Sequence, residues 1–511
     1  MHKAFNILIE NYLCQEIDMK KTGDLNSGIS GIFWLSLSSF FNYALQLVIM
    51  MVLARQLSPS DFGEFAAITI LIGIAELFWM MGVGKAIVQS QNISDLLIGT
   101  AFTLNIIFGL VILLLVNLFA GFLGTLFNIT DVYMLRVFSF VFILHSVAEV
   151  SKSLSHKKLK FKRMSLIGII SLITFGVSSI TFSLFGFGVW SLVFANIIMA
   201  STSMLLYISL EPIKFRIIIC RNSAKELLFF GSGFTIASVF NYTANNGDYY
   251  VINKVSSKAA LGEYQKAYQL LMYPVKLLGD TLDQVLFPLL SKYQNDKEKL
   301  KHVFICGNGC VAICSIPVTI VAFFQAEEMV NFLLGNQWTN VVYPFKILVI
   351  GLFFRIAYKL SDSLIRAMGK VYQWAIVQFI YATMVVTGAY LGSFYGLAGI
   401  AAGVNIAFSI NYFMMLFLVK LQLGSLSKAM LSSLLPSLIT GVITACMVII
   451  YDKFIKIESS LLSLVCATAY TLIIYIIITK LFWNYIVPIS LREFLINIYS
   501  NINKKLNIKW R

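Results

Sequence analysis

The sequence predicts an all-α integral membrane protein with fourteen transmembrane helices, arranged as two parallel six-helix repeats followed by two extra helices. Its 511 residues are 59% hydrophobic and 12% charged, with a mean hydropathy of +0.82. Soluble domains are about 45–50% apolar and about 25% charged. The chain also contains fourteen apolar stretches of bilayer-spanning length, separated by short loops, and one residue pattern that occurs twice in register.

The predicted spans begin close to the N-terminus, and no cleavable signal pattern precedes them. Met19, which opens the segment MKKTGDLNSG, is an alternative start to Met1. The fourteen spans are residues 29–54, 62–89, 97–122, 132–154, 164–186, 188–209, 225–252, 262–290, 302–325, 341–366, 371–393, 396–420, 432–452 and 461–482.

The basic residues indicate how these spans are oriented. Lys and Arg are concentrated in alternate loops, above all Lys152–Arg163, Pro212–Lys225 and Lys292–Lys301. By the positive-inside rule these loops are cytoplasmic, and an even number of spans then places both termini in the cytoplasm. The net charge of +15 therefore reflects membrane orientation, and no nucleic-acid partner is predicted.

A motif shared by the first and seventh predicted helices indicates an internal duplication. The tripeptide FNY at residues 41–43 is followed by GEF at residues 63–65, and FNY at residues 240–242 is followed by GEY at residues 262–264. The offset is the same for both parts, 241 − 42 = 199 residues. Because each copy holds an even number of spans, both copies enter the membrane in the same orientation and form a parallel repeat.

Five segments follow from this division. They are a cytoplasmic N-terminal segment (1–28), an N-terminal six-helix lobe (29–215), a C-terminal six-helix lobe (216–424), two further helices (425–483) and a basic cytoplasmic tail (484–511). Apolar residues in the tail recur at helical spacing and basic residues follow them. The tail is therefore predicted to be an amphipathic anchor on membrane lipids of the inner leaflet.

The tenth predicted span carries an unusual row of charges. Arg355, Lys359, Asp362 and Arg366 are spaced i, i+4, i+7 and i+11, which places all four on one helix face. A charge at the bilayer centre costs about 2.5–3.5 kcal/mol on insertion scales, so this face is expected to meet protein or a wet cavity rather than lipid. The alternative is that the members from Lys359 onward extend to the inner membrane surface.

Polar residues recur at helical spacing in other spans. Those expected to bind substrate, besides Arg355, Lys359 and Arg366, are Lys276, Asn241, Asn245, Asn42, Gln46 and Gln269. Candidate carriers of a coupling H⁺ or Na⁺ are Glu76, Asp248, Asp280, Asp283 and Asp362, and His145 and Glu149 share one helix face. Span midpoints place Glu76, Lys276 and Arg355 near the bilayer centre. The competing interpretation is ion pairing for helix packing, as in Lys276–Asp280 and Lys359–Asp362.

The residue types point to a transported anion with sugar groups. The Arg guanidinium is a planar fork that suits phosphate oxygens, Lys supplies a compact charge, and Asn and Gln can bind sugar hydroxyls. No catalytic motif such as HExxH, GxSxG or a P-loop occurs, so neither an enzyme nor a cofactor is predicted. Without an ATP site, transport would draw on an ion gradient or on the substrate gradient.

Several segments resemble the Wzx-type polysaccharide flippases of the MOP exporter superfamily. The opening SGIFWLSLSSFFNYALQLVIMMVLARQLSPSDFGEFAAI is similar to that family as a whole. GVGKAIVQ, EYQKAYQLLMYPVKLLGDTLDQVLFPLLSKYQNDKEKL and FLLGNQWTNVVYPFKIL resemble its colanic-acid-exporter branch. The resemblance runs from about Ser27 to Leu421. The branch often has Asp on the second helix, where this chain has Glu76.

The resemblance implies two six-helix lobes around a central cavity, with two extra helices. It implies that the substrate is an oligosaccharide repeat unit on undecaprenyl diphosphate, moved across a bacterial inner membrane by alternating access. Lys276 and Arg355 occupy suitable places for a cationic cavity, and polysaccharide polymerase machinery is an expected partner. The alternatives are a multidrug cation antiporter of the same superfamily, which would want an acidic cavity, and a membrane-embedded glycan polymerase, which would want a large outer loop.

Overall fold

The computed structural model describes residues 22–80, 82–90, 94–213, 217–292, 296–454 and 460–481. Its regular elements are all helical within these ranges. The predicted amphipathic tail and most of the predicted N-terminal segment lie outside the described residues.

The helices group into two compact units. The N-terminal unit comprises Trp34–Lys266 and Ala382–Ile400, and the C-terminal unit comprises Met1–Phe33, Ala267–Tyr381 and Ala401–Arg511. The first ten helices are α2 (Thr22–Gln56), α3 (Pro59–Met80), α4 (Val83–Gln89), α5 (Asp95–Leu118), α6 (Ala120–Leu126), α7 (Val132–Phe138), α8 (Val141–Lys157), α9 (Phe161–Leu184), α10 (Val189–Leu210) and α11 (Arg221–Val255).

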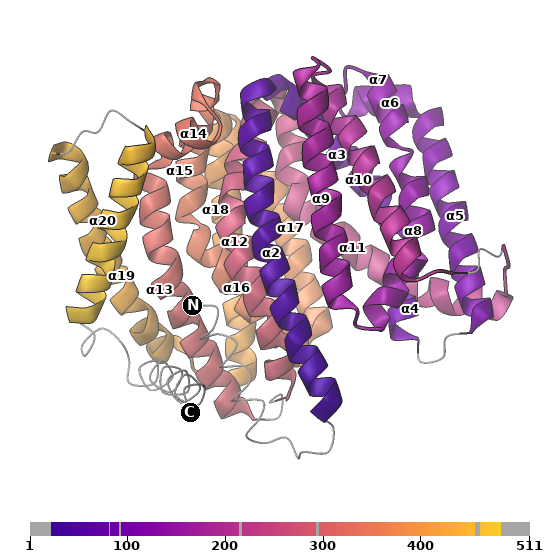
Figure 1. The fold of residues 1–511 in the computed structure, drawn as a ribbon. Helices are drawn as coiled ribbons and strands as arrows, with labels where there is room; N and C mark the ends of the chain where they lie inside the picture. The colour runs from indigo at the N-terminus through magenta and orange to yellow at the C-terminus, as the bar shows by residue number, and fades with distance from the viewer. Residues whose placement is uncertain are drawn as a thin grey trace, which may run out of the picture. The chain divides into compact units, whose positions relative to one another are not determined.

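The remaining helices lie mainly in the C-terminal unit (Figure 1). They are α12 (Lys258–Lys292), α13 (Lys297–Phe324), α14 (Ala326–Leu333), η1 (Asn336–Val341), α15 (Val342–Ile350), α16 (Leu352–Ala367), α17 (Val371–Ser393), α18 (Gly396–Leu423), α19 (Ser427–Phe454) and α20 (Ser460–Leu481). The unit boundaries cut through α2, α12, α17 and α18.

Each predicted span coincides with one helix or with two consecutive helices. Ten of the described helical segments are long and apolar enough to cross a membrane, and the pair α15–α16, bent by 44°, makes an eleventh. Large apolar side chains also face outward along these helices; Leu114 and Leu118 of α5 are 63% and 78% exposed. Because so much exposed apolar surface is stable only in lipid, this is a multi-pass membrane protein. The full set of fourteen spans and the repeat stay predictions.

Several predicted spans are broken rather than continuous. Residues 62–89 form α3 and α4, with Gly82 at φ +65° between them. Residues 341–366 break at Gly351, where the side chain of Asn405 lies so close that a Cβ on residue 351 would collide with its Oδ1. The Asn405 amide donates to the carbonyls of Ile347 and Leu348. A break inside a membrane is stable when a neighbouring side chain satisfies the freed carbonyls in this way.

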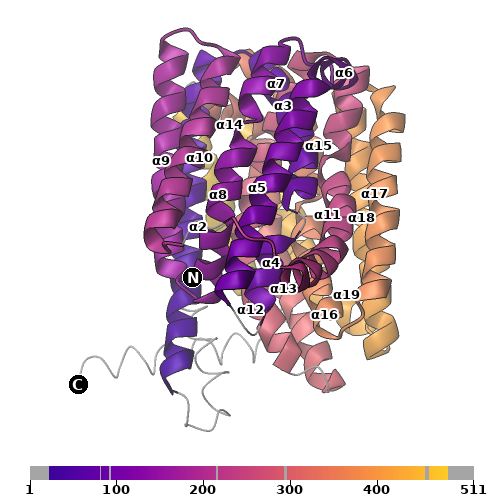
Figure 2. The same ribbon diagram turned by 90° about the vertical axis from the view of Figure 1, so that its right-hand side faces the viewer.

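The core of the N-terminal unit is built around α8, which packs against α5 and α10, while α10 packs against α9 (Figure 2). An apolar cluster joins α4, α5, α8 and the first turns of α11 through residues that include Ile87, Leu104, Leu154 and Leu227. The linker before α11 is also attached to α5. Its Ile218 and Cys220 amides donate to the hydroxyls of Thr103 and Thr100 at 3.0 Å each.

In the C-terminal unit, α13 packs against both α16 and α19, and α20 packs against α19 and α14. Figure 1 shows α19 and α20 side by side next to α13. The two helices predicted to lie outside the repeat are therefore an integral part of this unit.

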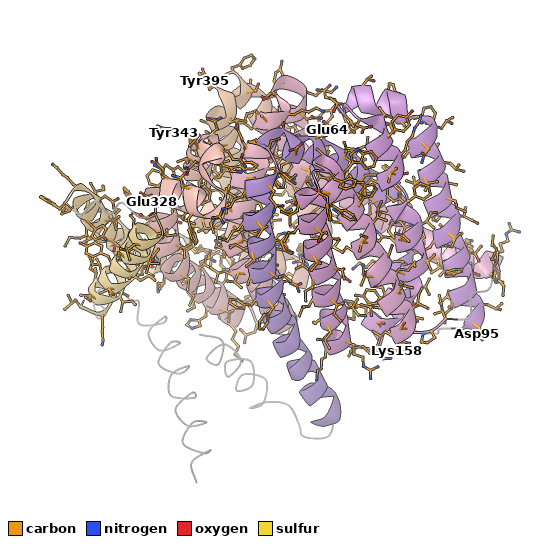
Figure 3. The ribbon with its side chains drawn as sticks, turned by 45° about the horizontal axis from the view of Figure 1, so that its top comes forward. Glu64, Asp95, Lys158, Glu328, Tyr343 and Tyr395 are labelled. Carbon is orange, nitrogen blue, oxygen red and sulfur yellow. The ribbon has the colours of Figure 1, made fainter. Side chains whose placement is uncertain are left out.

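Figure 3 places the labelled residues of the N-terminal unit at its two ends. Lys158 and Asp95 lie at one end and Glu64 at the other.

Candidate functional site

Arg355 is buried inside the C-terminal unit, with 2% of its surface exposed. Its Nη1 donates to the hydroxyl of Tyr268 at 2.9 Å. The guanidinium carbon lies 4.9 Å from the ring centroid of Tyr268 and 4.2 Å from that of Phe408. The planar cation is thus held between two aromatic faces, which offsets part of the cost of burying it. The predicted location of Arg355 away from lipid fits this geometry.

Asp362 is bound by several donors on α16 and α17. Its Oδ2 lies 2.7 Å from Nη2 of Arg366, and its Oδ1 accepts from Nε1 of Trp374 at 2.6 Å and from the hydroxyl of Tyr358 at 3.2 Å. Gln378 donates in turn to that hydroxyl at 2.7 Å. This network holds α17 against α16. The ion pair of Asp362 in it is with Arg366, whereas the ion-pairing interpretation named Lys359.

The two candidate lysines of this unit, Lys276 and Lys359, are less buried than Arg355. Lys276 on α12 is exposed, and Lys359 on α16 is half-buried with its side-chain stem against Gly279. Gln269 donates to the hydroxyl of Tyr273 at 3.1 Å, one turn further along α12. Lys276 is therefore the candidate cation of α12 that is accessible in this conformation. The side chains of Asp280 and Asp283 lie outside the described residues.

The predicted polar residues of α11 belong to the N-terminal unit. Asn241 and Asn245 are exposed, and Asn245 donates to the side-chain oxygen of Asn241 at 2.9 Å. Asp248 is buried and accepts from the hydroxyl of Tyr264 at 2.9 Å and from the Tyr249 amide at 2.9 Å. In α2, Asn42 and Gln46 are half-buried. Asn241 and Asn245 are thus on the surface of the protein, whereas Asp248 accepts hydrogen bonds in its interior.

Glu64 anchors a network at one end of the N-terminal unit that was not predicted from the sequence. It is 4% exposed and forms an ion pair with Lys258. Its Oε1 accepts from the Thr130 amide at 2.6 Å. Close by, Nδ2 of Asn128 donates to the Asn253 carbonyl and Nδ2 of Asn253 donates to the Phe127 carbonyl, both at 2.5 Å.

The same network includes the two copies of the repeated motif. A Cβ on Gly63 would collide with the carbonyl of Lys258, and one on Gly262 would collide with that of Pro59. The two Gly-Glu-aromatic motifs therefore touch each other through their glycines. The signal in the sequence was the pair of glycines at equivalent positions, which can mark a close approach of two backbones.

At the opposite end of the unit, Glu211 holds the loop that follows α8. It forms ion pairs with Lys158, at 2.6 Å, and with Lys160, and its carbonyl accepts from the hydroxyl of Ser151 at 2.9 Å. Burial raises the pKa of the Glu211 carboxyl, but the hydrogen bonds and charges of the two lysines outweigh burial and leave the pKa below its usual value.

Glu76 lies beside α8 rather than alone. Its Oε1 is 3.9 Å from Nδ1 of His145, and one turn further along α8 the carboxylate of Glu149 is 3.8 Å from Nζ of Lys152. His145 and Glu149 are spaced to share one face of α8, and Glu76 is predicted to lie near the bilayer centre. The structure brings these residues together within the N-terminal unit.

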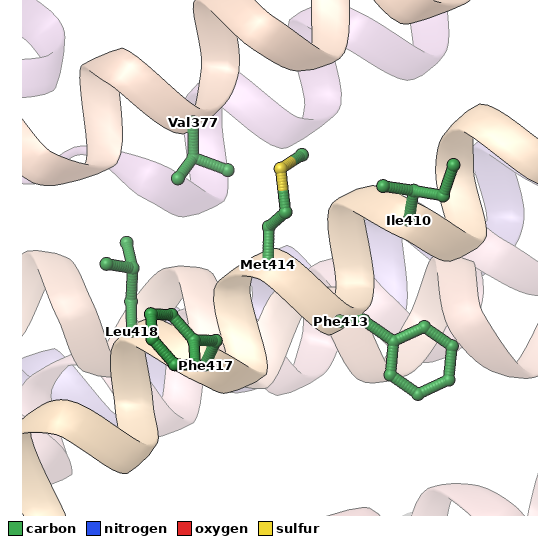
Figure 4. Close-up of a pocket in the computed structure, with 6 residues that line it drawn as sticks. All are labelled: Val377, Ile410, Phe413, Met414, Phe417 and Leu418. Atoms are coloured by element: carbon green, nitrogen blue, oxygen red, sulfur yellow. The ribbon is translucent and has the colours of Figure 1, made fainter.

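A pocket of about 450 Å³ lies between α17 and α18 in the C-terminal unit (Figure 4). It is lined by apolar side chains alone, including Val377, Met414 and the largely exposed Phe413 and Phe417. None of the candidate site residues lines it. Its chemistry suits a hydrocarbon chain, as expected of a surface that faces lipid.

Comparison of the sequence with known proteins identifies the family of this chain. A family model described as "Polysaccharide biosynthesis protein" matches residues 52–343, more than half of the chain. The chain belongs to the polysaccharide biosynthesis protein family.

Two known proteins match the chain over most of its length. The lipopolysaccharide biosynthesis protein WzxC of Escherichia coli (strain K12) is 24% identical over 80% of this chain and 84% of the relative. The teichuronic acid biosynthesis protein TuaB of Bacillus subtilis (strain 168) is 20% identical over 81% of this chain and 88% of the relative. These values agree with the predicted resemblance to polysaccharide flippases.

Solved structures extend the comparison to the fold. The lipid II flippase MurJ, in an inward closed conformation, matches with a TM-score of 0.74 and 18% identity, over 88% of this chain and 98% of that one. A multidrug resistance MATE family transporter of the MOP superfamily matches with a TM-score of 0.56 and 13% identity, over 83% and 99%. The polysaccharide biosynthesis family member described here therefore has a MOP-type fold.

Proposed function

We propose that this protein is a flippase for surface polysaccharide synthesis in a bacterium. It moves oligosaccharide repeat units linked to undecaprenyl diphosphate from the inner to the outer leaflet of the cytoplasmic membrane. The observation that carries the proposal is the family match, joined to a fold shared with a lipid II flippase. The names of the relatives, which concern lipopolysaccharide and teichuronic acid synthesis, support the same class of substrate.

The proposed mechanism is alternating access by two parallel six-helix lobes, with both termini in the cytoplasm. Lys276 is exposed and binds the diphosphate first. Arg355 reaches the anion after Tyr268 and Phe408 separate, because these rings hold its guanidinium in the present conformation. Lys359 and Arg366 guide the headgroup in from the cytoplasmic side.

Polar uncharged residues complete the proposed binding surface. Asn42, Gln46, Asn241, Asn245 and Gln269 offer amides to the glycan hydroxyls. Flipping makes and breaks no covalent bond, so no enzyme activity is proposed. The polymerase that joins the flipped repeat units is the proposed partner on the outer side.

A multidrug cation antiporter is the alternative that the fold alone would permit. Such a protein needs negative charge facing its substrate. Lys276 is instead an exposed cation on α12, and the two relatives are named for polysaccharide synthesis. We therefore favour an anionic, glycan-bearing substrate.

Deletion of the gene, followed by lipid analysis, tests the proposed function. A strain without the flippase should accumulate complete lipid-linked repeat units on the cytoplasmic leaflet. Single repeat units on the outer surface would indicate a polymerase instead, and incomplete units would indicate a glycosyltransferase.

Complementation with variants then tests the cationic residues. Removing a cation that binds the diphosphate costs about 1.5–3 kcal/mol, equivalent to a loss of about tenfold or more in transport. Lys276→Ala and Arg355→Ala should show this loss, whereas Lys370→Ala, which removes an exposed cation outside the proposed surface, should not. Normal polysaccharide levels with both of the first two variants would refute the cationic site.

A further inference from the structure

The break between α15 and α16 is held by one side chain from a helix that is distant in the sequence. The two helices meet at Gly351 with a bend of 44°. In an unbroken helix the Gly351 amide would donate to the Ile347 carbonyl, four residues back. It donates instead to the Leu348 carbonyl at 3.1 Å, and the side-chain amide of Asn405 on α18 donates to the Ile347 carbonyl. The Ile347 carbonyl therefore has two available donors, one in a bent segment and one in a straight segment.

The side chain of Asn405 is costly to bury at this position. It is 9% exposed, and its Oδ1 accepts no hydrogen bond from the residues that the structure describes. A buried amide oxygen without a donor lowers stability, whereas a leucine of similar shape would fill the space without that cost. The oxygen also lies against Gly351, and the three atoms nearest to a Cβ at that position all belong to Asn405. A role at the break explains this amide better than packing does.

α18 also contacts the next turn of the same segment, through Phe408. The Arg355 amide donates to the Gly351 carbonyl at 3.1 Å, so Arg355 lies one turn beyond the break. Phe408 follows Asn405 by three residues, on the same face of α18, and its ring centroid lies 4.2 Å from the guanidinium carbon. The ring of Tyr268 lies 4.9 Å from the same carbon. One helix therefore contacts both the break and the cation beyond it, and all of these residues belong to the C-terminal unit.

We propose that Asn405 is a positioning residue, which keeps Arg355 withdrawn from the substrate while the α15–α16 segment is bent. When the segment straightens, the Gly351 amide donates to the Ile347 carbonyl and the Asn405 amide is released. Arg355 then leaves the two aromatic rings and reaches the diphosphate. Because the Ile347 carbonyl has a donor in both states, the segment has two stable arrangements. The anion favours the straight one, since only there does it contact the guanidinium.

Loss of the Asn405 contact should shift this equilibrium toward the straight segment. Asn405→Leu leaves the Ile347 carbonyl without a donor in the bent state alone, which should change the ratio of the two states about fivefold or more. Gly351→Ala should act in the same direction, because its Cβ displaces the Asn405 side chain from the break. The double variant should show less than the product of the two separate effects, since both substitutions remove one contact.

Chemical modification measures the exposure of Arg355 without any substrate. In purified full-length protein, phenylglyoxal labels guanidinium groups, and mass spectrometry of the peptides gives the labelling rate of Arg355 relative to that of half-buried Arg366. Asn405→Leu and Gly351→Ala should each raise this ratio about fivefold or more. An unchanged ratio, in whichever of the two variants yields folded protein, would overturn the proposal.

Asn411→Leu is the matched control for this measurement. Asn411 is a second buried asparagine of α18, and its side-chain amide makes no hydrogen bond with the residues that the structure describes. Its replacement changes the same side chain in the same helix but leaves the break at Gly351 intact. The labelling ratio should therefore equal that of the wild type. An equal rise in Asn411→Leu and Asn405→Leu would show general loosening of α18 and would overturn the specific role of Asn405.

The identity of the anion rests on the proposed function, and binding of inorganic pyrophosphate tests that part separately. Because only the straight segment presents Arg355, Asn405→Leu should tighten pyrophosphate binding by about the factor that raises the labelling ratio. A merely structural defect would weaken binding, so measurable binding that is not tightened would overturn the positioning role. A gain that survives Arg355→Ala, or no binding to any variant, would refute the cationic site of the proposed function. A raised labelling ratio would then still establish that Asn405 keeps Arg355 withdrawn.

Discussion

Two charged residues of α16, Arg355 and Asp362, are held by side chains from other helices. Arg355 is held between the rings of Tyr268 and Phe408, and Asp362 is bound by Trp374 as well as Arg366. A buried charge left without such partners costs several kcal/mol. Because Arg355 and Asp362 lie in an apolar interior, each needs the polar and aromatic contacts that the structure shows.

The single substitution Glu211→Gln should destabilise the protein. The substitution leaves Lys158 and Lys160 without their shared carboxylate. Because both lysines are partly exposed, the loss should be about 1–2 kcal/mol, measured as a fall of a few degrees in the melting temperature in detergent. Glu327→Gln, which changes an exposed glutamate, is the control and should leave the melting temperature unchanged.

The pH dependence of this contribution follows from the lowered pKa of Glu211. The stabilisation is complete above the pKa of an unperturbed carboxyl, 4.5, and is lost as the pH falls through the lower value in the folded protein. The difference between wild type and Glu211→Gln should therefore persist at neutral pH and disappear only in acid. A difference that vanished near pH 7 would contradict this assignment.

Helix breaks and close contacts between elements determine how the spans are joined. Gly63 and Gly262 let two helix starts approach each other in the N-terminal unit, beside the Glu64–Lys258 ion pair. These contacts fasten together three hairpins that are distant in the sequence. They lie at the end of the unit where Figure 3 labels Glu64.

Adding a methyl group at this contact should be costly. Gly63→Ala and Gly262→Ala should each lower stability by about 1–3 kcal/mol, because backbone atoms occupy the space that the new Cβ needs. The double variant should lose less than the sum of the two, since one contact is broken in both. Gly121→Ala on α6 is the control, because nothing lies within 4 Å of its added Cβ. Thermal unfolding of the wild type and these four variants measures the losses.

The sequence predicted where the helices lie much better than where they break. Apolar length and charge placement are local properties, so each predicted span coincides with helical structure. The break at Gly351 depends on Asn405, which comes from a different helix, and the role of Glu64 depends on Thr130 and Lys258. The row from Arg355 to Arg366 was evident from spacing, but its aromatic and indole partners were not, since periodicity does not reveal which helices are neighbours.

The family and the fold of this protein fit a transporter that carries a large amphiphile across the bilayer. The proposed orientation places the Lys158 end of the N-terminal unit in the cytoplasm and the Glu64 end outside (Figure 3). The distribution of basic residues in alternate loops supports this orientation.

Cysteine labelling tests the orientation directly. In a background without the native cysteines, Thr125→Cys should react with a membrane-impermeant maleimide in intact cells. Lys158→Cys should react only after the inner membrane is permeabilised. Both positions are exposed on the N-terminal unit, so a difference in labelling reports sidedness rather than burial. The reverse pattern would invert the proposed direction of transport.

The attachment of the linker before α11 has a consequence for dividing the gene. Glu211 on one side of the linker, and Ile218 and Cys220 on the other, are all bound to the N-terminal unit. A chain cut between them would leave both new ends fastened to the same body, and the first turns of α11 would still be anchored through Leu227. The two predicted repeats could therefore be produced as separate polypeptides. They would associate through the contacts that the linker and the first turns of α11 make with the N-terminal unit. Such a fission would reverse the fusion event that an internal duplication implies.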